Sequence, residues 1–171
     1  ILDRIDEIKV YYEPIFSADS HSIVAYEVSG QIEIDNQTIN LVDFTYDTTI
    51  PEDLRKEVEL ALIKKAITEV KDSLNEFSLY LPCNPNLFMT DIGESYFQTI
   101  KQNLDESLLP KIFLVIPAHK YEGDADDLHH PIRYMKTYGV KIALDEIGKD
   151  SKLDQILMLE PTGLKININQ R

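Results

Sequence analysis

The sequence predicts an α/β fold of the β/α-barrel type, and two features of the 171-residue chain predict it. Strand-like apolar runs alternate with helix-like segments, which is the pattern of parallel strands joined by helical crossovers. In addition, two apolar runs late in the chain, 143–148 and 164–167, carry ionisable residues at or near their ends. In such barrels the active site is formed by side chains at the carboxyl ends of the parallel strands. A site is therefore expected at that end of the strands.

The first half of the chain contains a predicted hairpin and a long helix. Two β-rich runs, 10–16 and 22–28, are separated by the Ser- and Asp-rich segment 17–22, which is typical of a turn. From about residue 51 the apolar residues take helical spacing, and the expected buried stripe consists of Leu54, Val58, Leu62, Ala66 and Val70.

The second half alternates short strands with helices. The apolar runs predict strands at 77–81, 112–116, 140–144 and 164–168, and the intervening patterns predict helices at 95–104, from about 126 to 138, and around 153–159. Ser95 or Glu94 is expected to cap the first of these helices, and Asp126 or Asp127 the second. Gly139 is expected to end the second helix as a left-handed residue.

Composition excludes several classes of protein. The chain is 43% hydrophobic and 27% charged, which is ordinary for one globular domain, and its net charge is −13. Such a charge disfavours binding to nucleic acid polymers and to anionic membrane surfaces. No apolar run is long enough for a membrane span. The single Cys83 cannot form an internal disulfide, so we expect a cytoplasmic protein.

Four segments, in order, resemble the landmarks of EAL domains, the bacterial cyclic-di-GMP phosphodiesterases. They are Tyr-Glu-Pro-Ile at 12–15, Val-Ala-Tyr-Glu-Val at 24–28, Ala-Leu-Asp-Glu-Ile-Gly at 143–148 and Leu-Lys-Ile at 164–166. The resemblance covers nearly the whole chain and implies a single EAL-like domain over residues 1–171, folded as a TIM-type (β/α) barrel. Landmarks that follow Lys165 in this family would fall beyond Arg171. We therefore expect the C-terminal strands and any further domain to be missing from this chain, with open edges that favour self-association.

The resemblance implies that active members hold Mg²⁺ or Mn²⁺ at the strand ends and activate a water for attack on the phosphodiester. Three residues match the family's catalytic positions: Glu27 the name-giving glutamate, Asp145 the first aspartate, and Lys165 the lysine that contacts the water. Five other positions differ from the family pattern. The family has a metal-binding asparagine where this chain has Pro82, and a metal-binding glutamate where it has Val115. Likewise Glu146 replaces the second aspartate, Gln31 replaces an arginine that holds phosphate, and Ser29 replaces the leucine of the signature.

Because of these differences we expect Glu27, Asp145 and Lys165 to be remnants of a catalytic site, with no functional catalytic residue. Mg²⁺ requires several oxygen ligands, so a pair of carboxylates, Glu27 and Asp145, is expected to bind no metal at cellular concentrations, and no cofactor is expected. Asn84, two positions after Pro82, is expected to lie elsewhere. Without a metal the two carboxylates would repel each other, and we expect Lys165 to serve as the cation between them.

Three functions follow in order of preference. The first is a catalytically inactive EAL-like domain that acts as a regulatory or protein-interaction module in cyclic-di-GMP signalling. The second is a receptor that binds cyclic-di-GMP without hydrolysis, for which Gln31 and Glu146 are the candidate contacts. The third is an active phosphodiesterase.

Other motifs are read as structural. His129 and His130 are adjacent on a predicted helix and point apart, so we expect surface residues rather than metal ligands. Cys83 lacks a nearby histidine in sequence and is expected to be a small buried side chain rather than a nucleophile. The acidic run 124–127 is expected to cap a helix rather than bind Ca²⁺.

Overall fold

The computed structural model describes residues 2–147 and 159–166. Its strands are β1 (Lys9–Phe16), β2 (Ile23–Ile34), β3 (Gln37–Asn40), β4 (Ser78–Pro82), β5 (Ile112–Ile116), β6 (Lys141–Ile147) and β7 (Gly163–Ile166). Its α-helices are α1 (Leu41–Tyr46), α2 (Glu52–Val70), α3 (Pro85–Phe88), α4 (Glu94–Gln102) and α5 (His129–Thr137). Short 3-10 turns cover Leu2–Glu7, Lys71–Ser73, Met89–Asp91, Glu106–Lys111, Ala118–Lys120 and Ala125–Leu128. The helix expected around 153–159 falls almost entirely outside the described residues.

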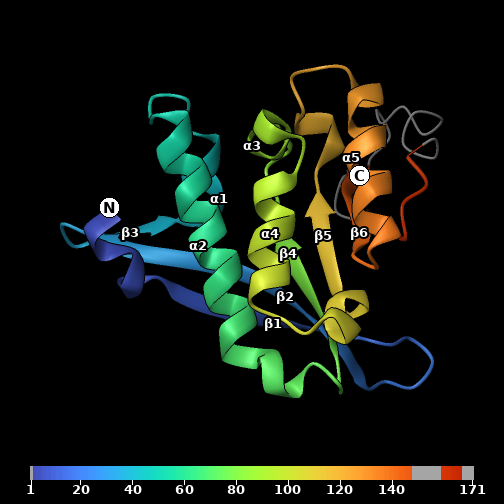
Figure 1. Ribbon diagram of the computed structural model, residues 1–171. Helices are drawn as coiled ribbons and strands as arrows, with labels where there is room; N and C mark the ends of the chain where they lie inside the picture. Colours follow the sequence, from blue (N-terminus) through green and yellow to red (C-terminus); the bar gives the residue numbers. More distant parts are fainter. Residues whose placement is uncertain (1, 148–158, 167–171) are drawn as a thin grey trace.

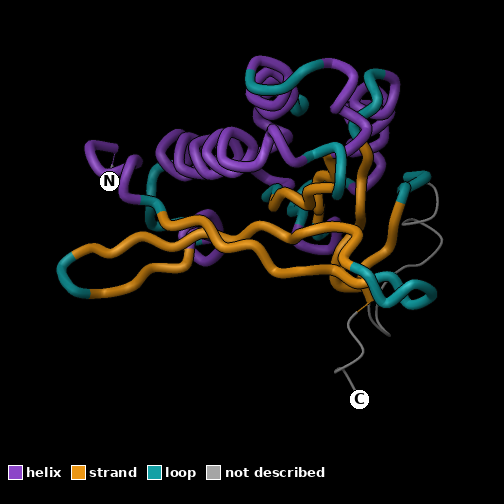
Figure 2. The backbone as a smooth tube through the Cα atoms, turned by 90° about the horizontal axis from the view of Figure 1, so that it is seen from below, coloured by secondary structure: helices purple, strands orange, loops and turns teal. Residues whose placement is uncertain are grey.

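One mixed sheet carries the fold (Figure 1). Its strand order is β1-β2-β4-β5-β6-β7, and β3 pairs with β2 off this path. Strands β2, β4, β5, β6 and β7 are mutually parallel, while β1 and β3 run antiparallel to β2. The predicted hairpin is therefore confirmed as β1 and β2, and the predicted parallel strands are confirmed as well. Seen from below, β1, β2 and β3 form a long ribbon that extends beyond the helices (Figure 2).

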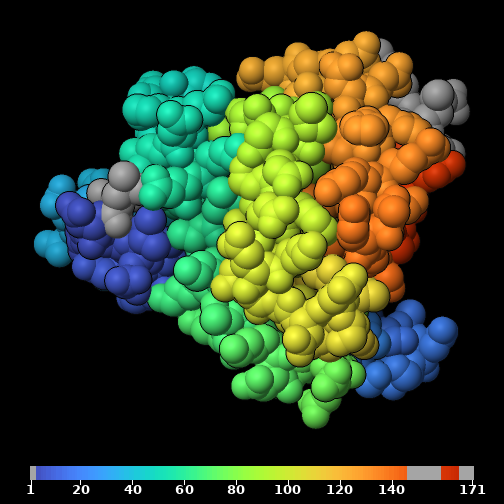
Figure 3. All heavy atoms as spheres, viewed as in Figure 1, coloured from blue at the N-terminus to red at the C-terminus, as the bar shows by residue number. Residues whose placement is uncertain are grey.

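Helices α2, α4 and α5 lie side by side over one face of the sheet and form a continuous surface (Figure 3). Aromatic side chains join the last two helices, because the rings of Phe97 in α4 and Tyr134 in α5 lie 5.5 Å apart in edge-to-face contact. The predicted stripe of α2 faces the sheet: Val58, Leu62 and Ala66 are at most 1% exposed, and the end residues of the stripe pack against the same core. Burial of these apolar faces supplies the main stabilisation of the fold.

Gly30 in β2 lies against leucine side chains of α1 and α2. A Cβ atom at residue 30 would lie 2.7 Å from Cδ1 of Leu62 and 2.8 Å from Cδ1 of Leu41. Only a residue without a side chain fits between these two leucines without repacking, so Gly30 allows α1 and α2 to seat on β2.

The predicted capping residues of two helices are wrong, although the helix expected from residue 95 begins within one residue of that position, at Glu94. Helix α4 has Gly93 at its N-cap, and the side chain of Asp91, rather than that of Ser95 or Glu94, accepts a hydrogen bond from the Ser95 amide at 3.2 Å. Near residue 126, Asp124 caps a 3-10 turn, and α5 begins only at His129. In both places a separate short turn precedes the helix, and periodicity cannot resolve such a turn.

The turn between α3 and α4 places a β-branched residue in a strained conformation. Ile92 has φ of 58° and is 55% exposed. The hydrogen bonds from the Gly93 amide to the Phe88 carbonyl (2.8 Å) and from the Ile92 amide to the Met89 carbonyl (3.4 Å) define a Schellman motif, in which glycine is the preferred residue at the position of Ile92.

Ile92→Gly is therefore expected to raise the free energy of unfolding by about 1 kcal/mol, because a left-handed β-branched residue costs more than glycine's added unfolded-state entropy. Urea denaturation measures the change. Ile92→Ala retains the left-handed strain and should gain less, and a loss of stability in Ile92→Gly would contradict this reading.

Candidate functional site at the carboxyl ends of the parallel strands

Three charged side chains from three parallel strands lie close together. Glu27 lies in β2, Asp145 near the end of β6, and Lys165 in β7. The ammonium Nζ of Lys165 lies 2.7 Å from Oε1 of Glu27 and 3.9 Å from Oδ1 of Asp145. In the sheet order β2 and β7 are separated by three other strands, so a direct contact between them requires strong curvature of the sheet. The structure thus brings together the three residues that sequence analysis singled out.

Electrostatics favour the charged form of Lys165. Burial lowers the pKa of this ammonium, but its hydrogen bond to Glu27 and the charges of Glu27, Asp145 and Glu13 raise the pKa more, and the net shift is upward. Glu13 was not identified from the sequence as a site residue. It lies directly opposite Glu27 in the antiparallel β1–β2 register, a pairing that the predicted hairpin could have revealed. Lys165 is therefore the counter-charge for a group of acidic side chains.

Lys165→Met is expected to lower the free energy of unfolding by about 1 kcal/mol, because it leaves Glu27 and Asp145 without their shared cation. The effect is modest since the Lys165 side chain is 46% exposed and water screens the charges. Thermal and urea denaturation measure it, and Lys165→Arg should retain most of the stability. Unchanged stability in Lys165→Met would eliminate the counter-charge role.

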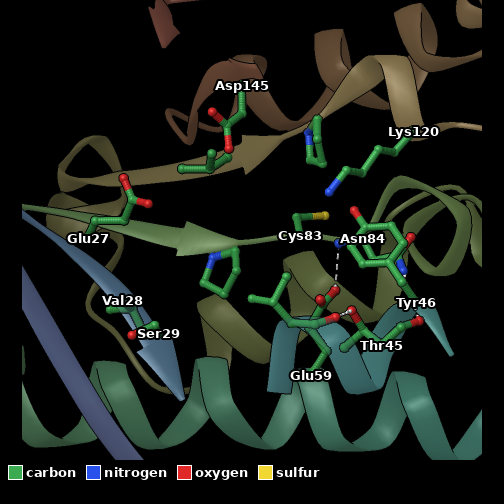
Figure 4. Close-up of a pocket in the computed structure, with 14 residues that line it drawn as sticks. Glu27, Val28, Ser29, Thr45, Tyr46, Glu59, Cys83, Asn84, Lys120 and Asp145 are labelled. Carbon is green, nitrogen blue, oxygen red and sulfur yellow. Dashed lines mark hydrogen bonds between the residues drawn. The ribbon is translucent and has the colours of Figure 1, made fainter. Parts of the chain in front are cut away.

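A pocket of about 190 Å³ lies beside this group (Figure 4). Glu27 and Asp145 line it, together with Pro82 and Val115, which are register partners on β4 and β5. Val115 is 6% exposed. Apolar side chains therefore occupy the two positions at which the resemblance implies metal-binding oxygen atoms.

The donors present do not fit the divalent metal that the resemblance implies. Glu27 and Asp145 supply carboxylate oxygens, but both face the ammonium of Lys165, and neither Pro82 nor Val115 has a side-chain donor. Within residues 2–147 and 159–166 no group of three His, Cys, Asp or Glu side chains is arranged to hold a metal ion. Mg²⁺ requires near-octahedral oxygen coordination, which this set does not provide.

Asn84 is engaged elsewhere. It is 1% exposed, its amide Nδ2 donates to the Thr45 carbonyl at 3.0 Å, and its Oδ1 accepts from the Asn86 amide at 3.0 Å, which caps α3. In Figure 4 it lies beside Tyr46 and Lys120, away from Glu27. Its carboxamide therefore serves local structure at the far side of the pocket.

The remaining candidates lie at the margin of the site or outside it. Gln31 follows Glu27 by four residues on β2 and so shares its face of the strand, but it does not line the pocket. Glu146 is in β6, and its side chain is not among the described ones. His129 and His130 lie on α5, away from this pocket. Cys83 lines the pocket, and burial raises the pKa of its thiol well above the usual value, which disfavours the nucleophilic thiolate.

Sequence reasoning missed Glu59, Thr45, Tyr46 and Lys120, which also line the pocket. Glu59 follows Val58 in α2, so the signal was an acidic residue at the border of a predicted apolar stripe. Nothing in the sequence pattern indicates that such a border residue turns inward.

This fold and site belong to a recognised class. The EAL domain model matches residues 2–170, and the chain therefore belongs to the EAL domain family. It is similar to the uncharacterised EAL-domain protein YkuI of Bacillus subtilis (strain 168), with 38% identity over 170 residues that cover 98% of this chain and 42% of YkuI. The chain thus spans less than half the length of that relative.

Solved structures agree with the fold. The crystal structure of YkuI in complex with substrate cyclic-di-GMP and calcium matches 97% of this chain and 42% of YkuI with a TM-score of 0.87. Vibrio cholerae LapD bound to cyclic-di-GMP matches 97% of this chain and 41% of LapD, with 16% identity and a TM-score of 0.78. An EAL domain protein from Listeria monocytogenes EGD-e matches 96% of this chain and 66% of that protein, with 18% identity and a TM-score of 0.74. The latter two support the fold alone. Among the described residues, no helix combines the length and apolar character of a membrane span.

Proposed function

We propose that this chain is a regulatory EAL domain that does not hydrolyse cyclic-di-GMP and that acts by binding another protein or a second copy of itself. One observation carries the proposal. Lys165 pairs with Glu27 at 2.7 Å beside a pocket that Glu27 lines and in which Pro82 and Val115 offer no oxygen ligand. The ammonium thus supplies the positive charge beside the two carboxylates that a metal would otherwise supply.

The same groups are poorly suited to catalysis without a metal. Attack on a phosphodiester needs an activated water and stabilisation of the charge that develops on phosphate. Lys165 has a raised pKa and remains protonated at neutral pH, so it cannot act as a general base. Glu27 and Asp145 would repel an anionic phosphodiester rather than stabilise it.

A product assay tests the loss of hydrolysis. The protein is incubated with cyclic-di-GMP in Mg²⁺, in Mn²⁺ and in EDTA, and the linear dinucleotide is measured by chromatography beside an active EAL phosphodiesterase. We expect no product in any buffer. Metal-dependent product would overturn the proposal.

Self-association has a structural basis in β1. In the described part of the chain β1 pairs only with β2, and two of its aromatic side chains, Tyr11 (46%) and Phe16 (60%), are exposed. An unpaired strand edge with apolar side chains favours pairing with another chain. Analytical ultracentrifugation over a range of concentrations tests this, and a monomer at all concentrations would leave only a different protein as partner.

A receptor for cyclic-di-GMP is the second candidate. It is favoured by the complex of YkuI with cyclic-di-GMP, because that relative shares 38% identity with nearly all of this chain. Calorimetric titration with cyclic-di-GMP in EDTA and in Mg²⁺ separates the candidates. Binding without product supports a receptor, whereas the absence of heat in both buffers leaves the protein-interaction module.

A further inference from the structure

Glu59 is a buried acid that the ion-pair group does not use. It lies on α2 beneath the loop between β4 and α3 and is 3% exposed. Its Oε1 accepts two hydrogen bonds, from the backbone amide of Asn84 at 2.8 Å and from the hydroxyl of Tyr96 at 2.5 Å. Both hydrogen bonds that the described residues donate to Glu59 reach this one oxygen. The second oxygen, Oε2, is therefore the site at which a proton can bind without displacing a donor.

This carboxyl belongs to the floor of the same pocket as Glu27 and Asp145 (Figure 4). Thr45, Cys83 and Asn84 also line this pocket. A molecule in the pocket could thus reach the side chain of Glu59, although very little of that side chain is open to solvent.

No cation within the described residues forms an ion pair with Glu59. Arg55, one turn earlier on α2, instead donates to the carbonyls of Thr45 (2.9 Å) and Ile50 (3.0 Å). The titratable groups packed against Glu59 are Cys83 after β4 and Tyr96 on α4, and its charge raises the pKa of both, in addition to the effect of their burial. The other titratable groups around the pocket are Glu27, Tyr46, Lys120 and Asp145. A charge on Glu59 is therefore compensated only by hydrogen bonds.

Both protonation states are accessible near neutral pH. Burial raises the pKa of Glu59 to about 7, while the hydrogen bonds from Tyr96 and Asn84 lower it and limit the rise. A neutral carboxylic acid donates a hydrogen bond through its proton, whereas the carboxylate only accepts. The chemistry of the pocket floor therefore differs between the two states.

We propose that Glu59 is a proton-controlled recognition group, whose neutral form donates a hydrogen bond from Oε2 to an anionic oxygen of a molecule bound in the pocket. The ligand class is an anionic phosphodiester, and in this respect the inference rests on the second candidate function, a receptor for cyclic-di-GMP. When Glu59 loses its proton, the floor becomes a third negative charge beside Glu27 and Asp145 and repels the same ligand.

Calorimetric titration with cyclic-di-GMP in EDTA, at about pH 6 and about pH 8, tests whether protonated Glu59 favours ligand binding. Because only the neutral form donates, the wild-type affinity is expected to fall roughly tenfold between these values. Glu59→Gln is the matched variant, since its carbonyl can still accept from Asn84 and Tyr96 while its amide donates at every pH. Its affinity should stay constant. Equal affinity of the wild-type protein at both pH values would overturn the inference.

Carbon-13 NMR of the glutamate carboxyls tests the proton site without ligand, and the Glu59→Gln spectrum identifies the resonance. We expect a midpoint near 7, and a higher midpoint in Tyr96→Phe, which lacks one donor to the carboxylate. A midpoint near the ordinary glutamate value would overturn the inference even if cyclic-di-GMP binds. A midpoint near 7 with no binding at either pH would instead overturn the receptor function and the ligand part together, and would leave the proton site standing.

Discussion

Replacing Glu59 with glutamine is expected to raise the free energy of unfolding by roughly 3 kcal/mol at about pH 8 and to change it little at acid pH. The folded-state pKa of Glu59 is raised to about 7 from an ordinary value of 4.5. As pH rises through this window the unfolded chain releases the proton before the folded chain does, so the wild type loses stability with rising pH. Glutamine does not titrate and avoids this loss.

Urea denaturation of both proteins at about pH 4.5 and about pH 8 measures the effect. Glu57→Gln is the matched control, because Glu57 is an exposed carboxyl on the same helix and its replacement should change stability little at either pH. A stability difference between wild type and Glu59→Gln that is the same at both pH values would show that Glu59 is not a buried titrating acid.

Asn84→Ala is expected to lower the free energy of unfolding by roughly 2 to 3 kcal/mol, the second largest effect. The substitution removes the N-cap of α3 and a buried hydrogen bond to the Thr45 carbonyl. Asn40→Ala is the matched comparison, because Asn40 also caps a helix, through its 2.8 Å bond to the Val42 amide, but is exposed. Asn40→Ala should cost about 1 kcal/mol by urea denaturation. Equal losses would show that the buried bond to Thr45 contributes nothing.

Much of the fold could be predicted because its signals are local. The hairpin of β1 and β2 has a polar turn between two β-rich runs, and the α2 stripe has helical spacing, and both are present in the structure. Strand β3 was not predicted from the sequence. In the structure Asp35 and Asn36 form the tight turn before it, with left-handed φ angles of 52° and 61° that suit a hairpin. The four residues of β3 are too short to give a clear alternating pattern.

The site was predictable only in part. Glu27, Asp145 and Lys165 were found because each matches a family landmark within or next to a predicted strand, and a barrel of parallel strands brings such positions together. Glu59 and Glu13 could not be placed in the same way. Glu59 reaches the pocket from helix α2, so its place depends on tertiary structure rather than on a motif. Glu13 does not line the pocket and lies opposite Glu27 through the register of the β1–β2 hairpin, which a family landmark does not specify.

Titration with Mn²⁺, followed by electron paramagnetic resonance, tests most directly the claim that Lys165 stands in place of a metal between Glu27 and Asp145. The wild-type protein is expected to leave Mn²⁺ free up to millimolar concentration, because Pro82 and Val115 add no donor to the two paired carboxylates. Val115→Glu, which supplies a third carboxylate, should bind Mn²⁺ more tightly. Stoichiometric binding of Mn²⁺ by the wild type at low concentration would contradict the account.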